Sequence, residues 1–439
     1  MTRDTMSQGN RRQFLRGAVV GGAAGLTGLA GCIQSSGDGN GDGNGNGNGN
    51  GNGNGNGNGG ASGTVPLAVL EPFTGPFSAL AEERHRGTEL AIQQINESDE
   101  YEFEFEYEEY DTQLDSESAI QEANNAVQSQ GAEFFTGCIS SSVALAMNEF
   151  AQDNEVLYTP GAADVSITGE NCNEWVFRFE TSTAQIAEVM SQWMAEEMGD
   201  QLFYHIADYA YGNSVHNEIG TRMENLSDGY EGVGITRSDP GSTDFASFIT
   251  QISDASDEAD ALVVGMTGAD LATFLTQAKD RGLHDEIPIV TTTGSFRAVM
   301  SGAGEGAYGI YSGTRYVPTI ETGDNQTFVS DYQDAYDGDL PDNFSRVGYE
   351  SIRMVANGIQ EAGSTDPADV KDTLPGMEHE TIFGPVEFRE CDHQATNPVW
   401  MAECVEPEEG DIADVNLLEG WELDGEEAAP DCESTGCSL

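Results

Sequence analysis

Residues 133–164 read EFFTGCISSSVALAMNEFAQDNEVLYTPGAAD and alternate short apolar runs with one longer amphipathic stretch. The runs at 133–136 and 156–159 predict strands, and the helical spacing of apolar residues over 143–153 predicts a helix between them. Pro160 and Gly161 end the second strand. This unit predicts two parallel strands joined by a right-handed crossover, because parallel strands cannot be joined by a tight turn.

The same alternation continues on both sides of this unit. Upstream, strands are predicted at 65–70 and 101–107, the second with aromatic residues alternating with glutamate, and helices at 80–95 and 116–130. A second series has helices at 184–198, 214–226, 245–255 and 269–281 and strands at 201–207, 233–236, 261–265 and 287–290. Two such series predict an α/β fold with two doubly wound parallel-sheet lobes.

The rest of the chain changes character. Residues 309–317 predict one more strand, and residues 327–336 and 344–362 predict helices. Two short runs, 383–388 and 399–404, flank a turn that contains Asn and Pro. They predict an antiparallel hairpin.

Ligands of parallel sheets bind beyond the carboxyl ends of the strands, so the loops that follow strands are the candidate site. In the loop 137–142, serine hydroxyls and free backbone N–H groups at a helix start can receive a carboxylate or carbonyl oxygen. A simple serine N-cap explains this loop equally well. The loop 159–164 has small residues that allow close backbone approach. The candidate residues are Ser140, Ser141, Ser142, Ala162 and Ala163.

In order and spacing, these residues resemble the solute-binding proteins of ABC importers, in the branch that includes leucine/isoleucine/valine-binding and amide- or urea-binding proteins. The resemblance extends from residue 65 to about residue 404 and rests on a series of short motifs rather than on any one. These are Pro72-Phe73-Thr74-Gly75, Gly87, Leu90-Ala91-Ile92, Ile95-Asn96, Tyr110-Asp111, 137–142, Thr159-Pro160-Gly161-Ala162, Asp208-Tyr209-Ala210-Tyr211-Gly212, 277–282 and Tyr349-Glu350.

The resemblance implies the type I periplasmic-binding-protein fold, in which two lobes joined by three crossovers close on a small solute. Lobe one would comprise 64–181 plus 315–383, lobe two 182–314 plus 384–421, and residues 422–439 would form an acidic tail. It also implies that the serines and the backbone of Ala162 and Ala163 hold the polar head of the ligand. The resemblance also implies that Tyr211, Thr267 and Thr293 of lobe two contact the ligand.

One position departs from the amino-acid binders that this chain resembles. Such proteins commonly place an acid near the Thr293 position to receive an ammonium group, and a buried ammonium without a partner is costly. Either Asp208 or Asp164 supplies the charge, or the ligand carries no ammonium. Ala163 also stands at a position that often holds threonine in amino-acid binders, so one more hydroxyl group is absent. The pair Gly137-Cys138 is similar to the amide- and urea-binding branch. The candidate ligands are a hydrophobic amino acid, a short amide or urea, and another small organic acid.

The N-terminus resembles a twin-arginine export signal with a lipobox. Arg11-Arg12-Gln13-Phe14-Leu15-Arg16 precedes a small apolar stretch, 17–31, that is shorter than the roughly 20 residues of a spanning helix. Cys32 follows Leu29-Ala30-Gly31 and would be lipidated after cleavage. We therefore expect a signal peptide at 1–31, a lipidated Gly/Asn-rich tether at 32–63, and a membrane anchor on the extracellular face. A soluble secreted protein is the alternative.

The charge of the chain is strongly negative. Its 77 acidic and 17 basic residues give a net charge of −60. Repulsion of this size destabilises a compact state unless salt screens it, and the Debye length falls to about 3 Å at 1 M salt. The composition is therefore typical of a halophilic protein. It excludes nucleic acid as a partner, because the sequence offers no basic patch.

Six cysteines besides Cys32 suggest disulfides in an exported chain. Local spacing favours three pairs, although it does not decide among the possible connectivities: Cys391 with Cys404 across the predicted hairpin, Cys432 with Cys437, and Cys138 with Cys172.

Catalysis is the competing function, and the sequence gives it little support. The histidines are scattered, and no metal-binding or serine-hydrolase motif is present in the sequence. We therefore expect no enzymatic activity, no metal and no cofactor, and a small solute and an ABC permease as partners. A tethered receptor that signals to a membrane sensor is the alternative function.

Overall fold

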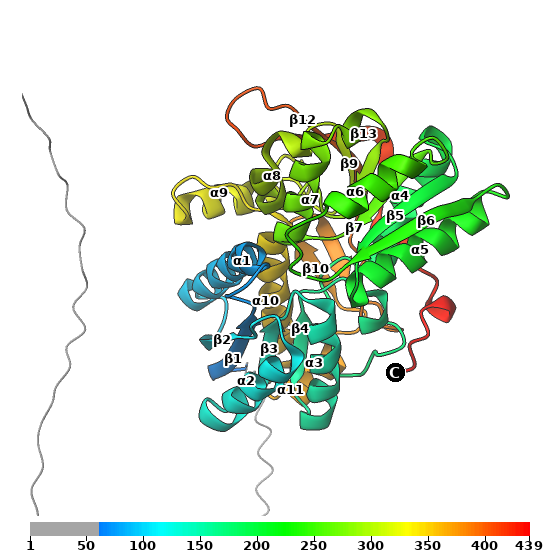
Figure 1. The fold of residues 1–439 in the computed structure, drawn as a ribbon. Coiled ribbons are helices and arrows are strands. Elements are labelled where there is room, and N and C mark those ends of the chain that lie inside the picture. Colours follow the sequence, from blue (N-terminus) through cyan, green and yellow to red (C-terminus); the bar gives the residue numbers. More distant parts are fainter. Residues whose placement is uncertain (1–60) are drawn as a thin grey trace, which may run out of the picture. The chain divides into compact units, whose positions relative to one another are not determined.

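The computed structural model describes residues 61–439, which form two lobes, each built on a parallel sheet (Figure 1). The predicted export signal, Cys32 and most of the tether lie outside these residues. Within residues 61–439, no helix is long and apolar enough to cross a membrane. The prediction of two doubly wound parallel-sheet lobes is confirmed.

The first lobe contains a four-stranded parallel sheet in the order β2-β1-β3-β4. Its strands are β1 (Gly63–Glu71), β2 (Phe103–Asp111), β3 (Phe134–Gly137) and β4 (Leu157–Pro160). Side chains of β1 alternate between two cores. Val65, Leu67 and Val69 pack on one face, and Ala68 and Leu70 pack on the other. Both faces are therefore covered by helices, as expected for a parallel sheet.

The second lobe contains a seven-stranded sheet in the order β13-β12-β9-β8-β7-β5-β6. Its parallel strands are β5 (Gln201–Ala207), β6 (Glu231–Ser238), β7 (Ala261–Gly265), β8 (Ile289–Thr291) and β9 (Ile310–Thr314). At one edge, β12 (Val399–Val405) and β13 (Asp414–Leu423) continue the sheet in antiparallel orientation. A separate two-stranded ribbon pairs β10 (Glu378–Thr381) with β11 (Gly384–Glu387).

Helices cover both sheets on both faces (Figure 1). In the first lobe they are α1 (Ser78–Glu97), α2 (Ser116–Ser129), α3 (Ser141–Asn154), α9 (Asn325–Ala335), α10 (Asn343–Ala362) and α11 (Pro367–Thr373). In the second they are α4 (Thr183–Glu197), α5 (Ala210–Leu226), α6 (Ala246–Ala255), α7 (Gly268–Asp280), α8 (Arg297–Ala303) and α12 (Gly425–Ala428). Short 3-10 turns are η1 (Val165–Ile167), η2 (Leu283–Asp285), η3 (Gly304–Ala307) and η4 (Cys432–Ser434).

Three crossovers join the lobes, and hydrogen bonds tie them to one another. The first leads from β4 to α4, the second leaves β9, and the third lies between β11 and β12. Gln394 of the third donates to the carbonyl of Glu180 in the first at 2.9 Å. Asn397 donates to the carbonyl of Phe179, and Arg315 of the second pairs with Glu180. The three segments therefore form one connected hinge.

The predicted hairpin of 383–388 with 399–404 is wrong. β11 pairs with β10, and β12 pairs with β9 and β13. Val386 and Phe388 pack in the core of the first lobe, so the return to the second lobe comes after β11 rather than at residue 384. The predicted acidic tail, 422–439, is also more structured than its composition suggests, because β13 extends to Leu423 and α12 and η4 follow it.

The disulfide pairing expected from local spacing is also wrong. The disulfides are Cys172–Cys437 and Cys391–Cys432, with Cα atoms 5.6 and 6.0 Å apart. They join the tail to loops that are distant in sequence. Cys138 and Cys404 are buried thiols that form no disulfide with any described residue. Cys404 lies in β12, an interior strand, and is therefore held away from the loop of Cys391.

We expect mapping of the unreduced protein with a glutamate-specific protease, which cuts between all of these cysteines, to recover a peptide that links Cys172 to Cys437 and another that links Cys391 to Cys432. Cys138 and Cys404 should resist alkylation until the protein is denatured, because both are buried. A peptide joining Cys391 to Cys404 would contradict this connectivity.

A glycine in α1 allows the close contact between α1 and α10 in the first lobe to form. A Cβ atom at Gly87 would lie 1.8 Å from the Ser345 carbonyl oxygen in α10. We expect Gly87→Ala to lower the free energy of unfolding by about 1 to 3 kcal/mol, because the helices would be forced apart. Gly220→Ala is the matched control in α5, since its Cβ would meet only the Tyr230 hydroxyl at 3.3 Å. It should leave the free energy unchanged or raise it by up to about 1 kcal/mol, because Ala favours helix. Denaturant unfolding in molar salt distinguishes the two.

Candidate functional site

A small cavity lies between the lobes, where the carboxyl ends of six strands meet. It is lined by Ile139, Gly161, Ala163, Tyr209, Tyr211, Thr267, Thr293, Arg315 and Phe344. All of these except Phe344, near the start of α10, belong to loops that follow β3, β4, β5, β7, β8 and β9 or to the helix starts after them. The cavity measures about 20 Å³, which is room for one water molecule.

Two loops form the first-lobe side of the cavity. Gly137 and Cys138 both have positive φ, 124° and 60°, so the chain turns sharply after β3 and brings Ile139 to the cavity. Gly161 lines the cavity from the loop after β4, and a Cβ atom there would lie 2.6 Å from the Nε of Arg84. Only glycine allows this close approach.

A buried ion pair supports these two loops from below. Arg84 donates to Glu71 Oε1 at 2.8 Å and to Thr136 Oγ1 at 2.8 Å, and it also donates to the carbonyl of Thr159. Both charged side chains are fully buried, and burial raises the pKa of Glu71 to about 7. The pair therefore connects β1, β3 and β4 directly beneath the loops that line the cavity.

Hydroxyl groups form much of the second-lobe side. Tyr211 shares a 2.6 Å hydrogen bond with Thr292, and burial raises the pKa of Tyr211. Thr293 donates to the carbonyl of Met266 at 2.8 Å. The hydroxyl of Thr267 is buried and has no hydrogen-bond partner among the described residues.

Arg315 brings a full positive charge to the cavity, and the sequence analysis did not identify it. It follows β9 directly, is 1% exposed, and pairs with the buried carboxylate of Glu180. Its Nη2 also donates to the Tyr211 hydroxyl at 3.3 Å and to the Thr292 carbonyl at 3.4 Å. The guanidinium lies over the ring of Phe296, 5.3 Å from its centroid. Its position directly after a predicted strand was the one feature of the sequence that could have indicated a place in the ligand site.

Four of the predicted ligand residues, Ala163, Tyr211, Thr267 and Thr293, line the cavity. The other predicted residues do not. Ser140, Ser141 and Ala162 are buried beside it, and Ser141 accepts the backbone N–H of Asp164 at 3.3 Å. Besides Arg315, the lining includes Ile139, Gly161, Tyr209 and Phe344, which the sequence did not predict as ligand residues.

Two predicted residues are placed away from the cavity. Ser142 is exposed, because it lies in the first turn of α3 on the side turned away from the core. Asp208 is also exposed and pairs with Arg237 at 3.4 Å. Asp164, the alternative source of charge, accepts the backbone N–H of Ser166 at 2.8 Å. Neither carboxylate therefore lines the cavity.

The two lobes contact each other around the cavity. The backbone N–H of Val165 donates to Ser214 Oγ at 3.1 Å on one side, and that of Ala269 donates to the Pro76 carbonyl at 3.4 Å on the other. Apolar residues cross the interface as well, since the core cluster of the second lobe includes Phe77, Leu80 and Ile139 from the first lobe. This is a closed arrangement of the lobes.

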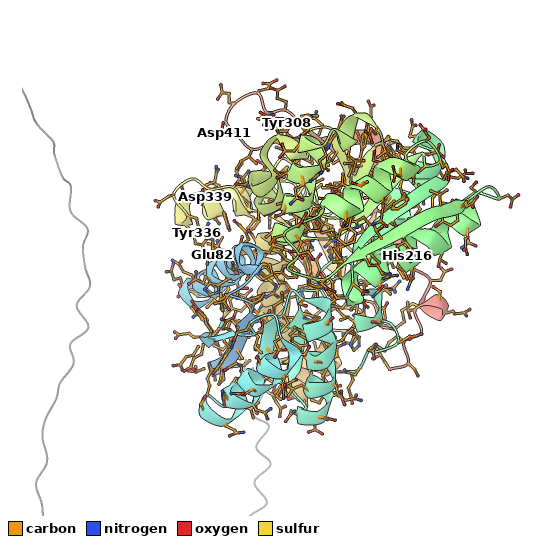
Figure 2. The ribbon with its side chains drawn as sticks, in the orientation of Figure 1. Glu82, His216, Tyr308, Tyr336, Asp339 and Asp411 are labelled. Atoms are coloured by element: carbon orange, nitrogen blue, oxygen red, sulfur yellow. A yellow bond between two sulfur atoms is a disulfide. The ribbon has the colours of Figure 1, made fainter. Side chains whose placement is uncertain are left out.

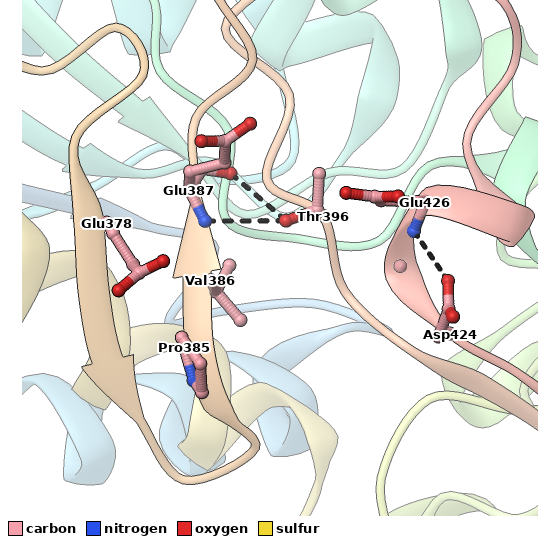
Figure 3. Close-up of a pocket in the computed structure, with 8 residues that line it drawn as sticks. Glu378, Pro385, Val386, Glu387, Thr396, Asp424 and Glu426 are labelled. Carbon is pink, nitrogen blue, oxygen red and sulfur yellow. Dashed lines mark hydrogen bonds between the residues drawn. The ribbon is translucent and has the colours of Figure 1, made fainter.

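Larger hollows exist elsewhere. One of about 430 Å³ is also lined from both lobes, by residues such as Arg297 and Tyr316, but none of the predicted ligand residues lines it. Another of about 470 Å³ lies between the β10–β11 ribbon and α12 (Figure 3). Four carboxylates line it, those of Glu378, Glu387, Asp424 and Glu426. Asp424 caps α12 by accepting the Glu426 N–H at 3.0 Å. Within residues 61–439, no group of His, Cys, Asp or Glu is arranged to hold a metal ion.

Comparisons with known proteins agree with this geometry. A family model described as "Periplasmic binding protein" matches residues 64–411. The "Leu/Ile/Val-binding protein homolog 3" of Brucella melitensis is 25% identical over 344 residues, which cover 74% of this chain and 87% of that protein.

Solved structures show the same fold. An amino acid ABC transporter substrate-binding protein from Pseudomonas fluorescens Pf-5 has a TM-score of 0.75 at 22% identity, with 86% of this chain and all of that chain covered. A solute-binding protein of an ABC transporter from R. palustris, in complex with benzoate, has a TM-score of 0.74 at 20% identity, with coverage of 86% and 100%. The matched family model shows that this chain belongs to the periplasmic binding protein family, and its two-lobed fold is the type I fold of that family.

Proposed function

We propose that this protein is an extracytoplasmic solute-binding protein of an ABC importer, which captures a small solute between its lobes and delivers it to the permease. The observation that carries this proposal is the cavity itself. Both lobes line it, and its lining comes from the strand ends where ligands of parallel sheets bind. The similarity to named binding proteins, rather than to enzymes, supports a role without catalysis.

The lining and the relatives favour a small organic solute. Apolar side chains, hydroxyl groups and one guanidinium surround the cavity, a mixture suited to a ligand with an apolar body and a polar head. Proteins similar to this chain are named for leucine, isoleucine and valine, and one was solved with benzoate. The candidates are thus a hydrophobic amino acid, a short amide or urea, and a small organic acid.

Lobe closure would couple binding to transport. A ligand that contacts both lobes does so fully only in the closed form, so it shifts the hinge equilibrium toward that form. In the closed arrangement the cavity has room for only one water molecule, so the lobes must separate before a solute can enter. The closed, loaded form would then dock on the permease.

The location proposed for this protein rests on its N-terminal sequence. The twin arginines at Arg11 and Arg12 support export in the folded state, and Cys32 supports a lipid anchor. The Gly/Asn-rich tether would let the binding domain reach both solute and permease from the extracellular face of the membrane. The acidic composition supports a halophilic environment.

We expect a solute that raises the thermal unfolding midpoint in molar salt also to make the protein more compact in solution scattering. Amino acids, amides, urea and small carboxylates form the screening panel. Compaction is expected because the ligand stabilises the closed lobes. A solute that raises the midpoint without changing the radius of gyration would contradict closure on the ligand.

Tyr211 should contribute to affinity through its hydroxyl group. We expect Tyr211→Phe to weaken binding of the solute by about 10-fold, the effect of one lost hydrogen bond, as measured by calorimetry. Tyr308→Phe is the matched control, because Tyr308 lies at the outer surface of the second lobe (Figure 2) and is not among the residues that line the cavity. Equal affinities of the two variants would argue against this site.

A further inference from the structure

We propose that the solute is a small monocarboxylate and that Arg315 is the residue that selects it. The inference rests on the proposed function, because it names the class of ligand for the same cavity. The ligand's carboxylate would bind the guanidinium of Arg315, and its apolar body would lie against Ile139, Tyr209 and Phe344. No ammonium group is required.

The charge of the cavity lining is the first argument. Of the residues that line it, Arg315 alone carries a permanent charge, and the rest are apolar, hydroxyl-bearing or glycine. The chain has only 17 basic residues and a net charge of −60, yet it buries this arginine to 1% exposure. Burying a charge is costly, so the site gains from an anionic ligand that offsets it.

The buried surroundings of Arg315 carry an excess positive charge. Its partner Glu180 is shared with Arg346, whose Nη2 lies 3.9 Å from Glu180 Oε2. Glu180 and Arg346 are both fully buried. Two guanidinium groups thus share one carboxylate. Glu350, the other acid that acts on Arg346, already pairs with Arg353 at 3.0 Å. An anion in the cavity would supply a second counter-charge.

Unused hydrogen-bond donors are the second, independent argument. Arg315 Nε and Thr267 Oγ1 are buried without a partner among residues 61–439, and both residues line the cavity. The contacts of Arg315 Nη2, at 3.3 and 3.4 Å, are longer than ordinary N–H···O bonds. A carboxylate could accept from the guanidinium and from the Thr267 hydroxyl together. Carboxylates bind guanidinium groups with two parallel hydrogen bonds.

The same geometry disfavours an amino acid. An ammonium group in this cavity would lie near the Arg315 guanidinium in a site of low dielectric, where like charges repel strongly. Asp208 is exposed beside Arg237, and Asp164 caps η1, so neither is placed to receive it. Glu180 is engaged by Arg315. A neutral amide could use the free donors but would leave the excess charge unbalanced.

Matched ligands that differ in one group test the proposal. Calorimetry in molar salt would compare benzoate with benzamide and benzylamine, and 4-methylpentanoate with leucine and 3-methylbutylamine. We expect at least one of the two carboxylates to bind at least about 30-fold more tightly than its neutral or amine counterpart. We also expect 4-methylpentanoate to bind at least as tightly as leucine. Preference for leucine over 4-methylpentanoate, or equal binding of carboxylate and amide, would overturn the proposal.

Variants assign the preference to Arg315. The variant Arg315→Gln removes the guanidinium and leaves Glu180 beside Arg346, whose Nη2 lies 3.9 Å from Glu180 Oε2, so Glu180 is not left as an uncompensated buried ion. It should lower the ratio of benzoate to benzamide affinity to within about threefold of one, whereas Arg315→Lys should keep part of the preference. Circular dichroism would establish that the variants fold. An unchanged ratio in the folded Arg315→Gln variant would exclude Arg315 as the selecting residue.

Arg86→Gln is the matched control for loss of one positive charge. Arg86 pairs with Glu82 and Asp339 and lies over the ring of Tyr336, and Figure 2 shows these three partners at the outer surface of the first lobe. It should keep the wild-type ratio, and an equal fall in its ratio would mean that net charge, not Arg315, sets the preference.

The outcomes separate this inference from the proposed function. Binding and compaction with leucine, an amide or urea, but with no carboxylate, would refute the inference and keep the solute-binding function. No binding of any amino acid, amide, urea or carboxylate would refute both.

Discussion

One buried carboxylate at the hinge is the constraint on which the rest of the structure depends. Glu180, in the first crossover, pairs with Arg315 in the second and accepts from Asn343 at the start of α10. Gln394, in the third crossover, donates to its backbone carbonyl. A buried ion pair is stable only when its remaining polar atoms are hydrogen-bonded, so these contacts must be satisfied together. They hold the three crossovers in one arrangement.

This arrangement places the strand ends of both lobes opposite one another. The strands β1–β4 of the first lobe and β5–β9 of the second run parallel within their sheets, so the loops that follow them gather at a single edge of each sheet. The crossovers bring those two edges together, and the cavity forms between them. Arg315 pairs with Glu180 at the hinge and also lines the cavity. The positive charge that a solute would contact therefore belongs to a residue that connects two of the crossovers. Binding and hinge geometry therefore share one residue.

Much of the fold could be predicted from local patterns. The unit at 133–164 and the alternation around it correspond to β3, α3 and β4 and to the strands and helices of both lobes. The exceptions lie where the pattern was short or where pairing is distant. β11 and β12 are neighbours in sequence, but β12 lies between β9 and β13 in the sheet of the second lobe and β11 pairs with β10, so they form no hairpin. The predicted disulfide pairing was wrong for a similar reason. It relied on local spacing, whereas Cys172 and Cys437 are 265 residues apart in sequence.

The candidate site was predictable only in part. Tyr211, Thr267 and Thr293 follow strands in the order that the resemblance implied, and they line the cavity. Arg315 also follows a strand, but nothing in the residues around it shows that its partner is Glu180, 135 positions earlier. Ser142 and Asp208 lie next to residues that line or flank the cavity, yet they face solvent. One position along a helix or loop changes the direction of a side chain, and local sequence does not specify it.

By itself, the sequence determined the net charge, the two parallel-sheet lobes, and the predictions of export and anchoring. These depend on composition and on periodicity over a few residues, which any segment carries without its neighbours. Only the tertiary structure decided which cysteines pair, where the tail packs, and that an arginine rather than an acid faces the cavity. Those outcomes depend on contacts between segments far apart in the chain, and only the folded hinge brings such segments together.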